Sequence, residues 1–255
     1  MNQSHFHTKD VFLIILVSVF SIGYSFAQNN EKKSVSLEIH FEHYVGDEVL
    51  QLDSGNYTNK LDQDFTVTKF NYYISNIQLT RKDGKIYFSD RHFLIKEEDF
   101  NSKMIELCAI PSGEYTSIQF TIGVDSLANC SGIQSGALDP IHGMFWTWNT
   151  GYIFLKLEGR SMASTAPNGI LEYHIGGFKS PSNCNRTVNL PLTDPLIISK
   201  KETSKVAMHV DVLELLTSPS DIDFSVLPVV TGTENAQMIC DNYVDAFAIQ
   251  PFKHD

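Results

Sequence analysis

Residues 35–41 read Val-Ser-Leu-Glu-Ile-His-Phe, and this stretch decides the fold class of the protein. Its apolar residues occupy every second position and alternate with Ser36, Glu38 and His40. Side chains two positions apart on a β-strand share one face, so the pattern predicts a strand with one buried and one polar face. The same character continues at residues 65–79, which are rich in β-branched and aromatic residues.

Segments of this kind recur along the chain and are separated by turn signals such as Lys82-Asp83-Gly84-Lys85 and Pro111-Ser112-Gly113. We predict strands at residues 35–41, 65–79, 86–95, 104–110, 115–122, 152–157, 170–175, 187–192 and 206–216. About nine short strands with recurrent turns favour an all-β fold, a two-sheet β-sandwich of Greek-key or immunoglobulin-like type.

Two regions depart from this strand rhythm. Residues 125–151 form a long loop that carries both tryptophans, Trp146 and Trp148, and long loops of this kind are usually functional or disordered. The two large aromatic residues favour an ordered loop. Near the C-terminus, Ile239, Tyr243 and Phe247 follow each other at helical spacing, which predicts one short amphipathic helix within residues 234–247.

The N-terminal part of the chain is predicted to be a targeting segment. Residues 11–20 are almost entirely apolar, a length typical of a signal peptide, and Ser25-Phe26-Ala27 supplies the small residues of a cleavage site. We therefore predict a signal peptide at residues 1–27, a flexible N-terminus at 28–34 and a single domain at 35–255. Because Lys9 is offset by Asp10, an uncleaved anchor stays open as the alternative.

The composition excludes two classes of protein. Aromatic residues make up 11% of the 255 residues and charged residues only 19%, whereas disordered chains are charge-rich and poor in aromatic residues. The net charge is −11, and the chain lacks the basic stripe with which proteins bind nucleic acids. The protein is therefore predicted to be globular, and to be periplasmic or secreted once the signal peptide is removed.

All four cysteines follow the predicted cleavage site, and an even number in an exported chain favours two disulfides. Three connectivities are possible. We favour Cys130–Cys184, because both residues lie in loop-like sequence, and Cys108–Cys240, because both border apolar segments. Four reduced, buried thiols are the alternative.

The histidines and the tryptophans raise the question of a binding site. His174 and His209 alternate with apolar residues and are predicted to face away from the core. A single histidine on a polar strand face is usually just solvated, but several from different strands could meet, and imidazole suits copper and zinc. The two tryptophans are by composition most often core residues. The sequence contains no HExxH, GxSxG, GxxxxGK[ST], GxGxxG or CxxCH motif.

Several segments together resemble the MbnP-like family of exported bacterial proteins, which is named after a copper-binding partner found with methanobactin systems. The resemblance extends from about Val35 to Phe247. Its most specific segment is Gly143-Met144-Phe145-Trp146-Thr147-Trp148-Asn149-Thr150-Gly151-Tyr152. The supporting segments are residues 41–43 with 45–46, 70–77, 111–115, 120–125, 173–177 and 241–243.

The resemblance implies an exported, non-enzymatic protein that binds copper. In the name-giving system, a dihaem MauG-like enzyme oxidises a tryptophan of its partner to kynurenine, which binds copper together with histidines. Carried over to this sequence, Trp146 or Trp148 is the residue to be oxidised, and His43, His174 and His209 are the candidate copper ligands. The alternatives are a structural or ligand-binding sandwich without a metal and, less favoured, a hydrolase.

Overall fold

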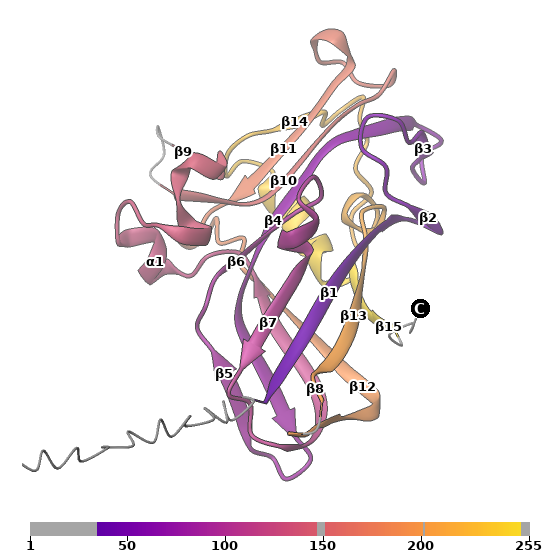
Figure 1. The fold of residues 1–255 in the computed structure, drawn as a ribbon. Coiled ribbons are helices and arrows are strands. Elements are labelled where there is room, and N and C mark those ends of the chain that lie inside the picture. The colour runs from indigo at the N-terminus through magenta and orange to yellow at the C-terminus, as the bar shows by residue number, and fades with distance from the viewer. Residues whose placement is uncertain (1–34, 147–150, 201, 251–255) are drawn as a thin grey trace, which may run out of the picture. The chain divides into compact units, whose positions relative to one another are not determined.

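The computed structural model describes residues 35–146, 151–200 and 202–250, which belong to one compact unit that begins at residue 33 (Figure 1). Its strands are β1 (Ser36–Val45), β2 (Glu48–Val49), β3 (Tyr57–Thr58), β4 (Asp64–Arg81), β5 (Ile86–Ser89), β6 (Phe93–Lys96), β7 (Met104–Cys108), β8 (Gly113–Ile122), β9 (Phe145–Trp146), β10 (Gly151–Arg160), β11 (Ile170–Gly176), β12 (Arg186–Ile198), β13 (Ser204–Asp211), β14 (Val229–Val230) and β15 (Phe247–Gln250). The helices are α1 (Ser126–Cys130), α2 (Ala236–Asp241) and the short 3-10 turns η1 (Phe100–Lys103), η2 (Gly136–Leu138), η3 (Pro140–His142), η4 (Pro167–Gly169), η5 (Glu214–Leu216) and η6 (Asn242–Val244).

The first sheet is built around β1, which contains most of the alternating stretch at residues 35–41. One edge of β1 pairs in parallel with β13, which in turn pairs with β15. The other edge is shared by two antiparallel strands, β7 along Ser36–His40 and β2 at Tyr44 and Val45. Among the described strands none pairs with Phe41 or Glu42 on that edge, and the next carbonyl, that of His43, accepts from the Leu50 amide at 2.9 Å. The edge of β1 is therefore open between β7 and β2 only over a short stretch (Figure 1).

The second sheet is larger and follows the order β12-β8-β4-β10-β11-β14. The long strand β4 organises it: β10 pairs with its first half and β8 with its second half. The short strands β3, β5 and β6 also pair with β4. The predicted all-β architecture of two sheets is therefore confirmed.

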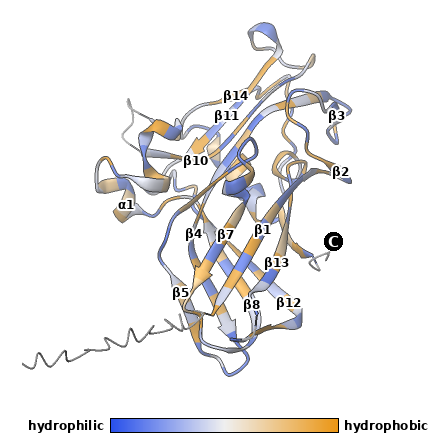
Figure 2. Ribbon diagram, in the orientation of Figure 1, coloured by the Kyte–Doolittle hydropathy of each residue, from blue (hydrophilic) through white to orange (hydrophobic). Residues whose placement is uncertain are grey.

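The hydrophobic core is formed by the strand faces that the alternating pattern predicts. Leu37, Ile39 and Phe41 on β1 are each less than 5% exposed, and hydrophobic and hydrophilic residues alternate along this strand in Figure 2. Burial of apolar surface, at about 25 cal/mol per Å², is the main force that holds such sheets together. Large aromatic residues such as Phe70 and Tyr72 of β4 are fully buried among them.

Three predicted elements differ in detail. Residues 86–95 form two strands, β5 and β6, rather than one. The predicted strand at 206–216 ends at Asp211, and Glu214–Leu216 forms a 3-10 turn instead. The C-terminal helix is present but short, because Phe247 pairs with Val210 and begins β15 instead of extending the helix.

The tryptophan-bearing region is ordered where it is described. It contains α1, η2, η3 and β9, and β9 pairs with β10 through Trp146 and Gly151. The predicted signal peptide and the flexible N-terminus at 28–34 lie outside the described residues. No helix of the described chain is long and apolar enough to cross a membrane.

Candidate functional site

The open edge of β1 carries a buried histidine, His43. Its side chain is fully buried, and it points from β1 towards the second sheet, where it packs edge-on against the rings of Phe70 and Tyr72. The residue is one of the three histidines that the resemblance assigns to a metal. The His43 imidazole is therefore packed like a core side chain, although it is polar.

Both ring nitrogens of His43 are hydrogen-bonded. Nδ1 lies 2.5 Å from Oε2 of Glu97, and Nε2 lies 2.9 Å from the hydroxyl of Tyr72. Burial lowers the pKa of His43, although Glu97 opposes this shift. Burial would raise the pKa of Glu97, but His43 and Lys103 together lower it. A neutral imidazole next to an ionised carboxylate is the consistent state, so Nδ1–H donates to Glu97 and Tyr72 donates to Nε2.

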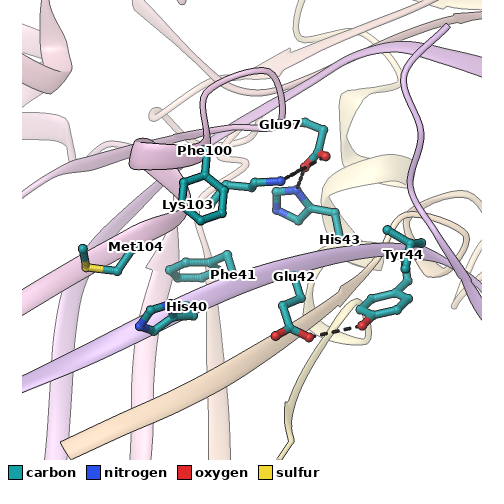
Figure 3. A pocket seen from close by; sticks show the side chains of 10 residues that line it. His40, Phe41, Glu42, His43, Tyr44, Glu97, Phe100, Lys103 and Met104 are labelled. Atoms are coloured by element: carbon teal, nitrogen blue, oxygen red, sulfur yellow. Dashed lines mark hydrogen bonds and ion pairs between the residues drawn. The ribbon is translucent and has the colours of Figure 1, made fainter. Parts of the chain in front are cut away.

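A pocket opens in front of this histidine (Figure 3). Its volume is about 390 Å³, and it is lined by His40, Phe41, Glu42, His43, Tyr44, Val49, Glu97, Phe100, Lys103 and Met104. His40 and Met104 face each other across the β1–β7 pair, and Figure 3 shows both at the same end of the pocket. The Lys103 ammonium binds both oxygens of Glu97, at 3.1 and 3.0 Å. Two imidazoles, one thioether and two carboxylates therefore line one pocket, with His43 on the inner face of β1 and His40 on its outer face.

The structure does not bring His43, His174 and His209 together. His174 on β11 lies in register with Lys156 of β10 and Asn71 of β4, one row away from Tyr72. Neighbouring residues of a strand point to opposite faces, so His174 lies on the face of the large sheet that is opposite to Tyr72 and His43. There it binds Glu158 at 2.8 Å.

His209 lies on a third surface. It pairs in register with Glu42 of β1, the neighbour of His43, so it faces the outer side of the smaller sheet. Its ring stacks on Tyr44 with a centroid distance of 4.4 Å. Its Nδ1 is buried without a hydrogen-bond partner in the described chain. His43 therefore lies between the two sheets, His174 on the outer face of the larger sheet and His209 on the outer face of the smaller sheet.

This arrangement does not fit a single metal ion bound by those three residues. Within residues 35–146, 151–200 and 202–250, no group of three or more His, Cys, Asp or Glu side chains is placed to hold a metal ion. The pocket in front of His43 does offer donors that copper accepts. A metal bound to His43 there would have to replace the hydrogen bond to Glu97, because Glu97 lines the pocket whereas Tyr72 does not.

Trp146 lies in a different pocket. It is 5% exposed, and the tip of its ring lies so close to Gly176 that a Cβ atom there would come within 2.7 Å of it. The pocket beside it has a volume of about 330 Å³ and is also lined by Gly151, Gly177, Phe178, Lys179, Ser180, Ser182 and Thr233. None of these residues lines the His43 pocket. Trp148, the other predicted site of oxidation, lies outside the described residues.

Comparison with known proteins decides the family. The model of the MbnP family matches residues 34–237, which is most of the chain. The chain belongs to the MbnP family. Among solved structures, MbnP from Methylosinus trichosporium is similar in fold, with a TM-score of 0.51 and 16% sequence identity over 78% of this chain and 81% of that chain. No curated protein matches the chain.

Several residues around His43 could not be predicted from the sequence. Glu97 and Lys103 lie in a charged, loop-like stretch around η1 that has no strand periodicity, and Met104 stands at the start of a strand. Tyr72 appeared as one of several aromatic residues of a core strand. Nothing in the local sequence links them to His43, since the contacts are made between strands far apart in the chain. The charge signal Glu97-Glu98-Asp99 followed by Lys103 was available but is common on loops.

The hydrogen-bonded groups around His43 argue against the hydrolase alternative. Glu97, His43 and Tyr72 form a carboxylate–imidazole–hydroxyl series, an order that nucleophilic enzymes also use. The hydroxyl here belongs to a fully buried tyrosine, and burial raises its pKa well above the usual value. A hydroxyl that neither ionises readily nor reaches the pocket is unsuited to attack a substrate.

The predicted disulfides are absent from the structure, which holds all four cysteines as thiols. Cys108 and Cys130 are exposed, at the end of β7 and of α1. Cys184 and Cys240 are buried, and the segments that carry them are joined by the ion pair of Arg186 and Asp241. The predicted pairs Cys130–Cys184 and Cys108–Cys240 therefore match neither the burial nor the neighbours of these residues. Loop composition could not reveal that the segments of Cys184 and Cys240 meet.

Asp125 anchors the start of the tryptophan-bearing region. Its carboxylate accepts a hydrogen bond from the Ala128 amide at 3.0 Å, capping α1, and binds His92 at 2.9 Å. Burial would raise the pKa of Asp125, but the Ala128 amide and His92 lower it below the usual value. A carboxylate with a lowered pKa in the folded state stabilises the protein above its unfolded pKa. That contribution is lost as the pH falls through the folded pKa.

We therefore expect Asp125→Ala to lower the free energy of unfolding by about 1–2 kcal/mol at pH 7. The difference from wild type should shrink when urea unfolding is repeated at a pH below the lowered pKa of Asp125, where its carboxyl is protonated in the folded protein too. Asp125→Asn, which keeps a capping oxygen without the charge, serves as the matched control and should lose less at pH 7. An equal loss for Asp125→Ala at both pH values would contradict the assigned role of the charge.

Proposed function

We propose that the protein is an exported copper-binding protein without catalytic activity of its own, which takes copper into the pocket at the open edge of β1. The observation that carries this proposal is the gathering of His40, His43 and Met104 around that pocket. Membership of the MbnP family supports it. Of the three histidines that the resemblance assigned, His43 is the one that lines this pocket.

The donor chemistry of the pocket suits copper. Imidazole nitrogen binds copper in both common oxidation states, and a thioether sulfur favours Cu(I). Copper on Nδ1 of His43 would take the place of the Glu97 hydrogen bond, and the Tyr72 hydroxyl on Nε2 would hold the ring in position, the kind of support that metal-binding histidines usually have. Lys103 in turn holds Glu97 in place. These residues of the chain position the ring and offer the donors, and bound copper would supply the redox or storage chemistry.

The redox partner is part of the same proposal. A dihaem MauG-like enzyme would oxidise Trp146 or Trp148 to kynurenine. Because the Trp146 pocket and the His43 pocket share no lining residue, a kynurenine at Trp146 would not bind the same copper ion as His43 unless the loop moved. The two parts of the proposal are therefore separable by experiment.

A copper titration with pocket variants tests the proposal. Wild type should retain about one copper after desalting, and a His40→Ala/Met104→Leu double variant should bind it about tenfold or more weakly in competition with a chromogenic Cu(I) chelator. His174→Ala is the matched control, because His174 lies on the far face of the larger sheet, and it should bind like wild type. Circular dichroism checks that each variant is folded. Peptide mass spectrometry of the protein from its native host locates any kynurenine.

Two outcomes would count against the copper site. One is a wild type that retains no copper, even after exposure to a dihaem oxidase. The other is a loss of copper in the His174 variant that the pocket variant does not share. Unmodified tryptophan in protein from the native host would remove the redox part and leave the copper part standing.

A structural or ligand-binding role without metal is the second candidate. The observation that favours it is the packing of Trp146, which is nearly fully buried and fills the space above Gly176. A tryptophan in that position stabilises the end of the sheet whatever the protein binds. The same titration separates the two functions, since the structural role requires no copper uptake by any variant.

A further inference from the structure

Two cysteines that are far apart in the sequence meet in the core. Cys184 precedes β12 and Cys240 lies in α2, and both are fully buried. The Cys240 thiol donates to the carbonyl of Gln237 at 3.6 Å, and the neighbouring Cys184 thiol together with burial raises the pKa of Cys240. The fully buried Tyr243 lies within electrostatic range of both thiols, as does Arg186.

The segments that carry the two thiols are already tied together. Arg186, two residues after Cys184, binds the carboxylate of Asp241 through Nε at 2.8 Å and through its Nη2 atom at 2.5 Å. The Gln237 side-chain amide donates to the carbonyl of Pro181. The amide of Cys184 donates to the carbonyl of Gly177 at 2.8 Å, which closes the loop before it. These bonds hold α2 against the loop of residues 177–184.

We propose that Cys184 and Cys240 form a disulfide in the exported protein, and that this bond clamps one side of the Trp146 pocket. The inference rests on the export that the proposed function includes, but not on copper binding. Cys108 and Cys130 are exposed in separate elements, and neither shares this buried site with the other pair. The structure therefore assigns one disulfide where the sequence favoured two.

The bond forms by thiol–disulfide exchange with a disulfide oxidant of the export compartment, such as a dithiol oxidase or oxidised glutathione. The thiolate of one cysteine attacks the disulfide of the oxidant and forms a mixed disulfide. The second cysteine then displaces the oxidant. Two S–H bonds are lost and one S–S bond forms, while the S–S bond of the oxidant breaks and its two sulfurs take up the two electrons and, through the solvent, the two protons to become thiols. The step takes place during folding, before both thiols are buried.

The position of the pair connects it to Trp146. The pocket beside Trp146 is lined on one side by the loop from Gly177 to Ser182, which leads into Cys184, and on another by Thr233, which precedes α2. A Cβ atom on Gly177 would lie 3.3 Å from Cγ2 of Thr233, so these two walls already touch. A disulfide between Cys184 and Cys240 would fix both walls and limit access to the tryptophan ring.

Peptide mapping tests the pairing. The full chain without its signal peptide is refolded with reduced and oxidised glutathione, quenched with acid, alkylated under denaturing conditions and digested without reduction. We expect a crosslinked peptide pair that contains Cys184 and Cys240, and alkylated Cys108 and Cys130. A Cys108→Ser/Cys130→Ser variant should keep the crosslink. A Cys130–Cys184 crosslink, or alkylation of both Cys184 and Cys240 in the folded protein, would overturn the proposal.

Reduction of the wild type provides a second measurement that needs no variant. The crosslink closes a loop of about 55 residues, so its reduction should lower Tm by roughly 10 °C. In a Trp148→Phe background, where Trp146 is the single tryptophan, reduction should also increase the quenching of its fluorescence by acrylamide. An unchanged Tm would contradict a bond in this position. Lower Tm with unchanged quenching would keep the disulfide and overturn its role at the Trp146 pocket.

Discussion

A Gly159→Ala variant is expected to lose about 3 kcal/mol or more of its free energy of unfolding, a large share of the stability of a typical domain. Gly159 lies on β10, where the register with β4 shifts, opposite Val67. A Cβ atom built on it would come within 2.0 Å of the carbonyl oxygen of Thr66, a backbone atom of the neighbouring strand. Because no side-chain rotation relieves that contact, β4 and β10 would have to separate. Urea unfolding followed by circular dichroism measures the loss.

Gly84→Ala is the control for this prediction. Gly84 has a φ of +81° and open space around its Cβ position, so alanine there adds backbone strain without a clash. Its expected loss is about 1 kcal/mol. If Gly159→Ala were no more destabilised than Gly84→Ala, the close approach of β4 and β10 would not be a feature of the protein in solution.

His43→Ala is expected to have the second large effect, a loss of about 3–5 kcal/mol in the free energy of unfolding. The substitution removes the hydrogen-bond partner of the fully buried Tyr72 hydroxyl, and it leaves the Glu97 carboxylate with Lys103 as its remaining partner in the pocket. A buried polar group without a partner keeps the full cost of losing water. The loss of the imidazole volume adds to this because the side chain is fully buried.

A double-mutant cycle separates the hydrogen bond from the cavity. When Tyr72→Phe is combined with His43→Ala, the hydroxyl that lost its partner is gone as well. The double variant should therefore lose less stability than the two single variants together, by about 1–3 kcal/mol. His40→Ala, on the same strand but 30% exposed in its side chain, should cost less than about 1 kcal/mol. Additive losses in the cycle would show that His43 acts by volume alone.

Much of the fold could be predicted from the sequence. The period of two at residues 35–41 gave the strand β1 and its buried face, and the long apolar segment at 65–79 became β4. These predictions succeed because the alternation of side chains along a strand is a local property. The predicted single strand at 86–95 and the helix through Phe247 were wrong in their boundaries. Those boundaries depend on which strand each residue pairs with, and pairing is not local.

The candidate site could be predicted only in part. His43 was named from the resemblance, and the structure places it in the pocket. His174 and His209 were named from the same resemblance, and the alternation in their strands predicts only that each lies on a polar face. The alternation of apolar and polar residues around His174 and His209 does not indicate which polar face of the two sheets each of them occupies. The two sheets have two outer faces and an inner space, and the three histidines are distributed over all of them.

The sequence by itself determined the fold class, the strands around β1 and β4, and the MbnP family, because each depends on residue types at fixed short spacings. The tertiary structure alone decided three matters. It showed that β1 is open between β7 and β2, that Glu97 and Tyr72 both bind His43, and that Arg186 and Asp241 join the segments that carry Cys184 and Cys240. The physical reason is the same for each. They are contacts between distant parts of the chain, fixed by strand order and register, and local spacing contains no record of either.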